Sequence, residues 1–207
     1  MSDPCGALVR ARAEAAGLTV TEELGDALSA YLALLARWDR KINLTAFDLD
    51  SPTDSAIDRL IIEPLRASRL IRATDRLSID IGSGGGSPAI PLRLAQPHLE
   101  TVLVEARERK AAFLREVARE LRLGNVHVEC DAFERFSGRV EWSGRADLIT
   151  MRAVRPDRAI WRAARSVIKG DGRFLWFAEM GETTNFSDMF RPIPVDEALP
   201  VEVLEAI

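Results

Sequence analysis

The stretch Leu77-Ser-Ile-Asp-Ile-Gly-Ser-Gly-Gly-Gly-Ser-Pro-Ala-Ile-Pro-Leu92 decides the fold that the sequence predicts. Residues 77–81 alternate apolar and polar, which indicates a short strand with Asp80 near its end. The glycines at 82, 84, 85 and 86 allow a sharp turn and close approach of a ligand, because no Cβ is in the way. A helix from Pro88 would aim its N-terminal N–H groups at that ligand. This order is typical of the nucleotide-cofactor corner of a doubly wound α/β sheet, although a plain glycine-rich turn has the same local pattern.

On either side of this corner the chain has two different patterns. Residues 1–75 show helical spacing and no strand pattern, so we expect a helical cap or subdomain there. Residues 76–207 alternate short apolar strands with helices, which predicts parallel βαβ units in a Rossmann-like domain that forms one compact unit with the cap. The expected strands are 77–81, 101–104, 126–130, 146–151 and 174–178, and the expected helices are 4–16, 21–38, 53–71, 107–123, 156–168 and about ten residues from Pro88.

Several turn and cap residues sharpen these boundaries. Thr21 is expected to cap the second helix, and Pro64 should kink or split the helix over residues 53–71. Residues 169–172 (Lys-Gly-Asp-Gly) are predicted to form a turn. The prolines at 192, 194 and 200 break any helix near the end, where Val201–Leu204 is predicted as one edge strand.

Composition excludes several classes of protein. With two cysteines and two histidines among 207 residues, neither a disulfide framework, a metal site nor a histidine-based triad is expected. Residues 1–25 lack the apolar core of a secretory signal, and no apolar run approaches the roughly 18 residues of a membrane span. We therefore expect a soluble cytoplasmic protein without membrane contact, and a monomer.

Charge is distributed unevenly along the chain. The formal net charge of −4 argues against a general binder of polyanions. Residues 135–173 nevertheless contain ten basic and four acidic residues, whereas residues 174–207 contain seven acidic residues and one basic residue. The basic stretch is compatible with a phosphate-binding face, and equally with a solvated helix surface followed by an acidic tail.

Glu105 is the second feature that indicates a cofactor. It follows the second predicted strand, 23 positions after Gly82, where an acid can accept hydrogen bonds from ribose hydroxyls. A solvated carboxylate at a strand end is the alternative. Ser87 occupies the last position of the six-residue dinucleotide fingerprint, so the glycines read Gly82-x-Gly84-x-Gly86 instead. This D-x-G-x-G-x-G form is usual in S-adenosylmethionine-dependent methyltransferases, which favours methyl transfer over hydride transfer.

Four segments in order resemble one family. Residues 38–45 (Trp-Asp-Arg-Lys-Ile-Asn-Leu-Thr) look like its W-N-x-x-x-N-L-T element, and residues 80–92 follow its D-x-G-[ST]-G-x-G-x-P-G-I-P-L element, with Ala89 for the last glycine. Residues 105–121 and 150–154 (Thr-Met-Arg-Ala-Val) are similar to two further elements. From about residue 24 to 181 the chain thus resembles the small-subunit rRNA guanine-N7 methyltransferases (RsmG, once called glucose-inhibited division protein B).

The resemblance implies a class I methyltransferase with a mostly parallel, seven-stranded-type sheet and S-adenosyl-L-methionine as cofactor. It implies 16S rRNA of the small ribosomal subunit as the partner. Guanine N7 has a free lone pair, so the chemistry requires positioning but no general base, and no catalytic residue is expected. The implied cofactor-binding residues are Asp80, Gly82, Ser83, Gly84, Gly86, Ser87, Glu105, Ala106, Phe133, Glu134 and Arg152, and the implied substrate-binding residues are Asn43, Arg59, Arg152 and Arg155.

The chain departs from the family around the expected substrate entrance. The element R-H-x-x-D-S-L appears as residues 59–65, with Leu60 for histidine and Glu63-Pro64 for Asp-Ser. Ala132 replaces the arginine of R-A-E, and Met180-Gly181 replaces a lysine-glycine pair. Either the same guanosine is methylated through changed contacts, or the chain has another RNA or small-molecule substrate. A cofactor-binding protein that docks on the ribosome without activity is the third possibility.

Overall fold

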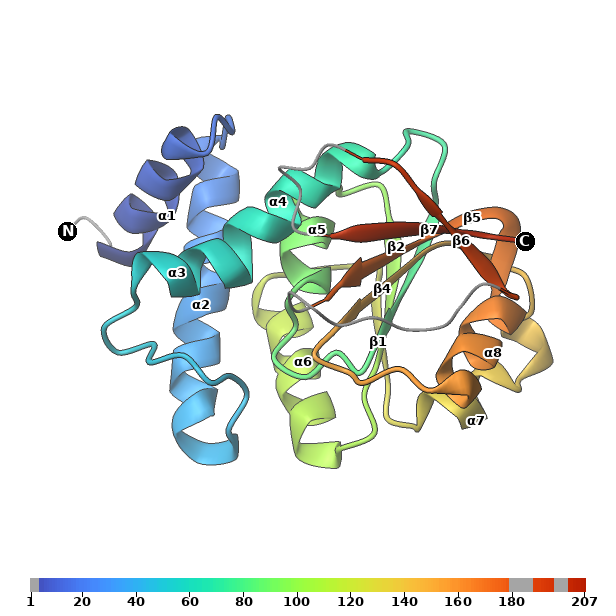
Figure 1. Cartoon of the computed structure of the whole chain (residues 1–207). Helices are drawn as coiled ribbons and strands as arrows, with labels where there is room; N and C mark the ends of the chain where they lie inside the picture. Colours follow the sequence, from blue (N-terminus) through green and yellow to red (C-terminus); the bar gives the residue numbers. More distant parts are fainter. Residues whose placement is uncertain (1–3, 179–187, 196–200) are drawn as a thin grey trace.

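The computed structural model describes residues 4–178, 188–195 and 201–207. Their strands form one sheet in the order β3-β2-β1-β4-β5-β7-β6, with helices on both faces (Figure 1). The first five strands of that order are parallel to one another, and β7 pairs antiparallel with both β5 and β6. This arrangement confirms the predicted Rossmann-like fold. The strands are β1 Leu77–Ile81, β2 Glu100–Val104, β3 Val126–Glu129, β4 Ala146–Arg152, β5 Ile168–Phe177, β6 Phe190–Ile193 and β7 Glu202–Ala206.

The helices form two groups. In Figure 1, α5 and α6 lie on one side of the sheet and α7 and α8 on the other, while α1 and α2 pack outside α5 and α6. Within the described part of the chain, no helix is long and apolar enough to cross a membrane. The helices are α1 Pro4–Ala15, α2 Glu22–Ile42, α3 Asp54–Ile57, α4 Glu63–Ala67, α5 Ala89–Ala95, α6 Glu108–Glu120, α7 Phe133–Ser137 and α8 Arg158–Val167, with short turns η1 Asp58–Ile62, η2 Ser68–Leu70 and η3 Val140–Trp142.

The long helix α2 joins the N-terminal helices to the α/β part. Thr21 caps it as predicted, because its hydroxyl accepts a hydrogen bond from the Leu24 N–H at 3.3 Å. The apolar spacing along α2 buries Tyr31 and Leu35 completely, in a cluster that includes residues of α5 and α6. Asn43 ends the helix in the left-handed conformation, with φ of 49°.

The predicted helix over residues 53–71 is divided at Pro64, as expected. It consists of α3, a π-helical turn η1, then α4 and a short 3₁₀ turn. The Glu63 N–H donates to the carbonyl of Asp58, five residues back, and Pro64 has no N–H to donate to Leu60 four residues back. The carbonyls of Arg59 and Leu60 therefore accept hydrogen bonds from side chains outside this helix.

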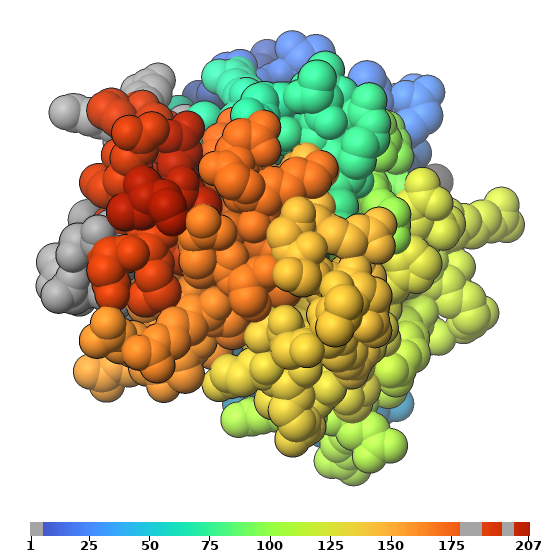
Figure 2. Space-filling model, turned by 90° about the vertical axis from the view of Figure 1, so that its right-hand side faces the viewer, coloured from blue at the N-terminus to red at the C-terminus, as the bar shows by residue number. Residues whose placement is uncertain are grey.

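The strand predicted at the end of the chain is present as β7, but its placement at the edge of the sheet is wrong. The strand there, β7, lies between β5 and β6, and β6 forms the edge instead. Pro192 is part of β6 and pairs in register with Leu204. An edge strand tolerates proline because one side of it needs no N–H donors. Figure 2 shows this hairpin in red beside the orange segment of α8 and β5, on the side turned away from the N-terminal helices.

The prediction that residues 169–172 form a turn between a helix and a strand is also wrong, because these residues belong to β5. Helix α8 runs directly into β5, whose first residue, Ile168, pairs with Ala146 of β4. The pairing then resumes with Arg173 opposite Leu148, so residues 169–172 form an irregular excursion within the strand. Ile168 is buried and pairs with Ala146, so the chain enters the sheet before the two glycines.

Candidate active site

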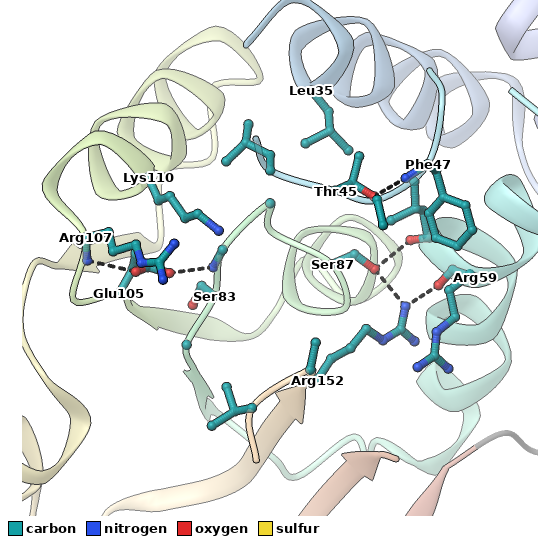
Figure 3. A pocket seen from close by; sticks show the side chains of 18 residues that line it. Leu35, Thr45, Phe47, Arg59, Ser83, Ser87, Glu105, Arg107, Lys110 and Arg152 are labelled. Atoms are coloured by element: carbon teal, nitrogen blue, oxygen red, sulfur yellow. Dashed lines mark hydrogen bonds between the residues drawn. The ribbon is translucent and has the colours of Figure 1, made fainter. Parts of the chain in front are cut away.

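A cavity of about 510 Å³ opens at the carboxyl ends of β1, β2 and β4. Strand order reverses between β1 and β4, and this switch point is where open α/β sheets bind ligands. The cavity also borders the N-terminal helices, through the segment after α2 and through η1 (Figure 3). Its lining residues are Leu35, Leu44, Thr45, Ala46, Phe47, Arg59, Leu60, Gly82, Ser83, Gly84, Gly85, Ser87, Glu105, Arg107, Lys110, Arg152, Ala153 and Val154.

The glycine loop forms the floor of the cavity. Gly82 has a φ of 66°, and a Cβ at this position would lie 2.5 Å from Cγ2 of Val154. Both the Gly82 and Ser83 N–H groups donate to the carbonyl of Val104, at 2.9 and 3.1 Å. The loop is therefore fastened to β2, and only glycine fits at its first position.

Glu105 closes one end of the loop. Its side chain is buried, and Oε2 accepts a hydrogen bond from the Gly84 N–H at 2.9 Å while Oε1 accepts one from the Arg107 N–H at 2.8 Å. A carboxylate has about four lone-pair sites, so each oxygen keeps capacity for another donor. Glu105 thus orients the loop and still offers acceptors to hydroxyl groups of a ligand.

Asp80 lies buried beneath the loop. Its Oδ1 accepts a hydrogen bond from the Thr150 hydroxyl at 2.5 Å, whereas Oδ2 is buried without a partner. Burial raises the pKa of Asp80 to about 6, against the opposing effects of the Thr150 hydrogen bond and the positive charge of Arg152. Burying a carboxylate oxygen without a donor is costly, and positive charge nearby offsets part of this cost.

Arg152 forms the wall opposite Glu105. Its guanidinium donates to the carbonyl of Arg59, to the Ser87 hydroxyl at 3.2 Å and to Oε2 of Glu63 at 2.9 Å. The same Glu63 oxygen accepts from Arg59 at 2.9 Å, and Arg152 also lies 4.5 Å from the centre of the Phe177 ring. Burial lowers the pKa of Arg152 to about 10, so it remains charged at neutral pH.

The divided helix supplies two of these contacts directly. Besides the Arg59 carbonyl bound by Arg152, the Leu60 carbonyl accepts from the Ser87 hydroxyl at 2.8 Å. Both carbonyls are released by the π turn and Pro64. The unusual Glu63-Pro64 pair therefore connects the helical segment to the wall of the cavity.

The N-terminal helices hold the loop from the other side. The Tyr31 hydroxyl donates to the Gly85 carbonyl at 2.7 Å, and a Cβ on Gly85 would lie 3.1 Å from the carbonyl oxygen of Leu44. Because Tyr31 is fully buried, the hydrogen bond has no competition from water.

We expect Tyr31→Phe to lower the free energy of unfolding by about 0.5–1.5 kcal/mol, because it removes this bond and leaves the Gly85 carbonyl without its donor. Urea denaturation measures the change. Ser55→Ala is the control, because it removes an exposed hydroxyl that bonds to the exposed Thr53 hydroxyl, and it should change stability by less. Equal stability of Tyr31→Phe and the wild type would contradict this role.

Half of the predicted site residues meet around the cavity. Gly82, Ser83, Gly84, Ser87, Glu105, Arg152 and Arg59 line it. Asp80 lies just below, and Gly86 turns away toward Ile90. Five further predicted residues are also outside the lining, namely Asn43, Ala106, Phe133, Glu134 and Arg155. The roles of all the predicted site residues remain predictions.

Other lining residues were missed by reasoning from the sequence. Arg107 and Lys110 lie at the start of α6, within the stretch that resembles the family, but no spacing singled them out. The segment 44–47 lies beside the cavity only because α2 crosses next to the glycine loop. Phe47 has no sequence signal at all.

The residues at which the chain departs from the family pattern lie in different parts of the structure. Leu60 lines the cavity and is buried, so an apolar surface stands where the family has histidine. Ala132 is the N-cap of α7 and offers no side-chain hydrogen bond. Met180 lies outside the described residues.

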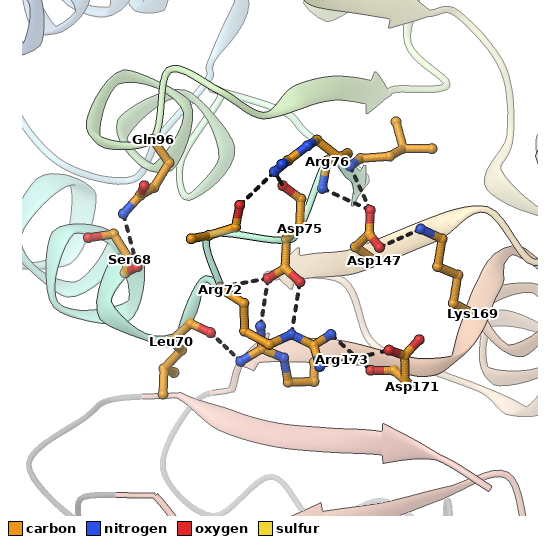
Figure 4. A network of polar contacts seen from close by, with 12 residues as sticks. Ser68, Leu70, Arg72, Asp75, Arg76, Gln96, Asp147, Lys169, Asp171 and Arg173 are labelled. Atoms are coloured by element: carbon orange, nitrogen blue, oxygen red, sulfur yellow. Dashed lines mark hydrogen bonds and ion pairs between the residues drawn. The ribbon is translucent and has the colours of Figure 1, made fainter.

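The arginine-rich stretch does not form a continuous free basic face within the described residues. Arg173 pairs with Asp75 at 2.6 Å and Lys169 with Asp147 at 2.5 Å (Figure 4). None of these four residues lines the cavity. Arg139 pairs with Glu129 at 2.9 Å. Most of this positive charge is therefore used within the fold.

The comparisons with known proteins point to one family. The model of the family described as rRNA small subunit methyltransferase G matches residues 25–187. Ribosomal RNA small subunit methyltransferase G of Chromobacterium violaceum is 32% identical over 188 residues, which cover 90% of this chain and 85% of that protein. The protein of the same name from Neisseria gonorrhoeae is 37% identical over 147 residues, which cover 70% of this chain and 66% of its own length.

Solved structures share the fold at low sequence identity. A SAM-dependent methyltransferase from Aquifex aeolicus has a TM-score of 0.54 at 13% identity, over 72% of this chain and 92% of that one. MtNAS, solved in complex with MTA and tNA, has a TM-score of 0.56 at 14% identity, over 87% and 73% of the two chains. At these identities the likeness concerns the fold alone.

Proposed function

The chain belongs to the rRNA small subunit methyltransferase G family, and from this membership we propose that it transfers a methyl group from S-adenosyl-L-methionine to N7 of a guanosine in 16S ribosomal RNA. The observation that carries the proposal is the pair of acids at the glycine loop. Glu105 offers acceptors for ribose hydroxyls, and Asp80 has a buried oxygen without a donor. A cofactor that carries a ribose and a positive charge would match the acceptors of Glu105 and the negative charge of Asp80.

The residues of the cavity fit this cofactor. When bound, S-adenosyl-L-methionine supplies an electrophilic methyl group on a positively charged sulfur. Asp80 would balance positive charge, and Glu105 would hold the ribose while keeping the loop in place. Four apolar side chains, Leu35, Leu44, Leu60 and Val154, would exclude water from the reacting atoms.

No proton has to be removed in this reaction, because guanine N7 already carries a free lone pair. The chain therefore needs to bring N7 and the methyl carbon into line and to hold them there. Arg152, restrained by the Glu63 carboxylate and by two other contacts, is suited to keep the wall of the cavity fixed during that approach.

The test is incubation of the full chain with labelled S-adenosyl-L-methionine and 30S particles that lack the modification. We expect label in 16S rRNA, recovered as 7-methylguanosine after digestion, and little label with Asp80→Ala. Label in another RNA or another nucleoside would favour the divergent methyltransferase. Binding to 30S particles without any label would favour the docking protein and contradict the proposal.

The raised pKa of Asp80 makes cofactor binding depend on pH. Burial raises this pKa to about 6, so Asp80 becomes ionised as the pH rises above that value. A cationic ligand favours the ionised form, and affinity for S-adenosyl-L-methionine should fall by up to about tenfold per pH unit below pH 6. Calorimetry at pH 5, 6 and 7 measures this slope. Asp80→Asn should bind with little dependence on pH, and a wild-type slope equal to that of the variant would contradict the assignment.

A further inference from the structure

Phe47 presents an aromatic ring to the cavity that the reaction described above does not use. Among the described residues that line the cavity, Phe47 is the one with an aromatic side chain, and this side chain is only partly buried. In Figure 3, Phe47 and Arg59 lie together at one end of the cavity, across from Glu105 and Lys110. The cavity therefore has a ribose-binding end at Glu105 and a second end with an aromatic ring and a guanidinium.

The backbone before Phe47 is held in place before any ligand binds. Asp39 Oδ1 accepts hydrogen bonds from the Leu44 N–H at 2.5 Å and the Thr45 N–H at 2.9 Å. The Phe47 N–H then donates to the Thr45 hydroxyl at 3.3 Å. These bonds fix the segment after α2, so that Phe47 is preorganised at the cavity.

Arg59 beside it is restrained in the same way. Its guanidinium donates to Glu63, which also binds Arg152, and its side chain remains about one-quarter exposed. A held guanidinium can contact a phosphate or a base edge with less loss of freedom than a mobile one. Unpaired RNA bases stack on aromatic rings and on the planes of arginine guanidinium groups.

We propose that Phe47 is the surface on which the target purine base stacks, with Arg59 contacting the same nucleotide. This inference rests on the proposed methyl transfer to RNA. A base stacked on Phe47 lies at the end of the cavity opposite the ribose-binding Glu105, so the reacting methyl group falls between the two ends.

The chemistry gives the ring a second effect. The N7 lone pair forms the new N–C bond while the methyl–sulfur bond breaks, and that bonding pair stays on sulfur as a thioether. No proton is released, and the purine gains the positive charge that sulfur loses. An aromatic face attracts a cation, so stacking on Phe47 should favour the charged product-like state over the neutral base.

The experiment compares Phe47→Leu and Phe47→Met, which keep an apolar side chain, with Phe47→Tyr, which keeps the ring. Each full-length variant is assayed with labelled S-adenosyl-L-methionine and undermodified 30S particles. We expect kcat/KM for the particles to fall roughly 5- to 150-fold in the Leu and Met variants, as for loss of one stacked base, and to be retained in the Tyr variant. Leu49→Ala, in the same loop but outside the cavity lining, is the matched control and should keep its activity.

Calorimetry with S-adenosyl-L-methionine and thermal denaturation separate this role from packing. Affinity and melting temperature should stay close to wild type in the Leu and Met variants. Full activity of those variants, an equal loss in Phe47→Tyr, or loss of cofactor binding would each overturn the inference. If the wild type itself transfers no methyl group to RNA, the proposed function fails and the inference fails with it.

Discussion

Replacing Asp75 by alanine is expected to lower the free energy of unfolding by about 3–5 kcal/mol, because it leaves a buried arginine without its counter-ion. The Asp75 side chain is 1% exposed, and its Oδ2 accepts from Nη2 of Arg173 at 2.6 Å. Arg173 is itself mostly buried, and it also donates to the carbonyl of Leu70. Figure 4 shows these groups joining the chain before β1 to β5.

Asp75 also binds the backbone that leads into the sheet. The Arg72 N–H donates to Oδ2 at 2.7 Å, and the Arg72 side chain donates to Oδ1 at 2.9 Å. Since the free energy of unfolding of a whole domain is only about 5–15 kcal/mol, the decrease expected for Asp75→Ala is a large part of the total.

Urea denaturation of Asp75→Ala and of a control variant measures this effect. Asp171→Ala is the matched control, because its carboxylate is 80% exposed and lies 4.0 Å from Arg72. An exposed pair of this kind contributes about 0–1 kcal/mol. A loss in Asp75→Ala no larger than in Asp171→Ala would show that the network in Figure 4 does not stabilise the fold.

Glu105→Gln is expected to weaken binding of S-adenosyl-L-methionine roughly 10- to 150-fold, as for loss of a hydrogen bond to a charged group. Both carboxylate oxygens accept backbone N–H groups, one from Gly84 and one from Arg107. A glutamine amide has only one oxygen, so its NH₂ group must face one of these N–H donors. The substitution therefore disturbs the glycine loop as well as the proposed contact to the ribose.

Calorimetry with S-adenosyl-L-methionine measures the change in affinity. Glu108→Gln, an exposed acid in the first turn of α6, is the control with the same change of charge. It should bind the cofactor like the wild type. Equal affinities of Glu105→Gln and Glu108→Gln for S-adenosyl-L-methionine would show that Glu105 does not contribute to cofactor binding.

The sheet could be predicted because its signals are local. Strands β1 and β4 are short segments rich in apolar residues and buried on both faces, and the glycines mark the turn after β1. Glu105 follows β2 directly, so parallel pairing with β1 brings it to the loop without further information. Where the signals were weak, at β6 with its Pro192, the strand order at the edge was predicted wrongly.

The wall of the cavity could not be predicted, because it depends on contacts between distant segments. Tyr31 meets Gly85, and Arg152 meets Arg59, only after α2 and the divided helix pack beside the glycine loop. Pro64 indicated a break in a helix, but not that the freed carbonyls would bind Arg152 and Ser87. Phe47 lies at the cavity for the same reason, through the turn that follows α2.

The most direct test of the account is calorimetric titration of the wild-type chain with S-adenosyl-L-methionine and, separately, with NAD. We expect saturable binding of S-adenosyl-L-methionine at one site per chain and no binding of NAD, because we propose that the glycine loop with Asp80 and Glu105 holds the methyl donor. Absence of binding by S-adenosyl-L-methionine, or binding of NAD in its place, would contradict it.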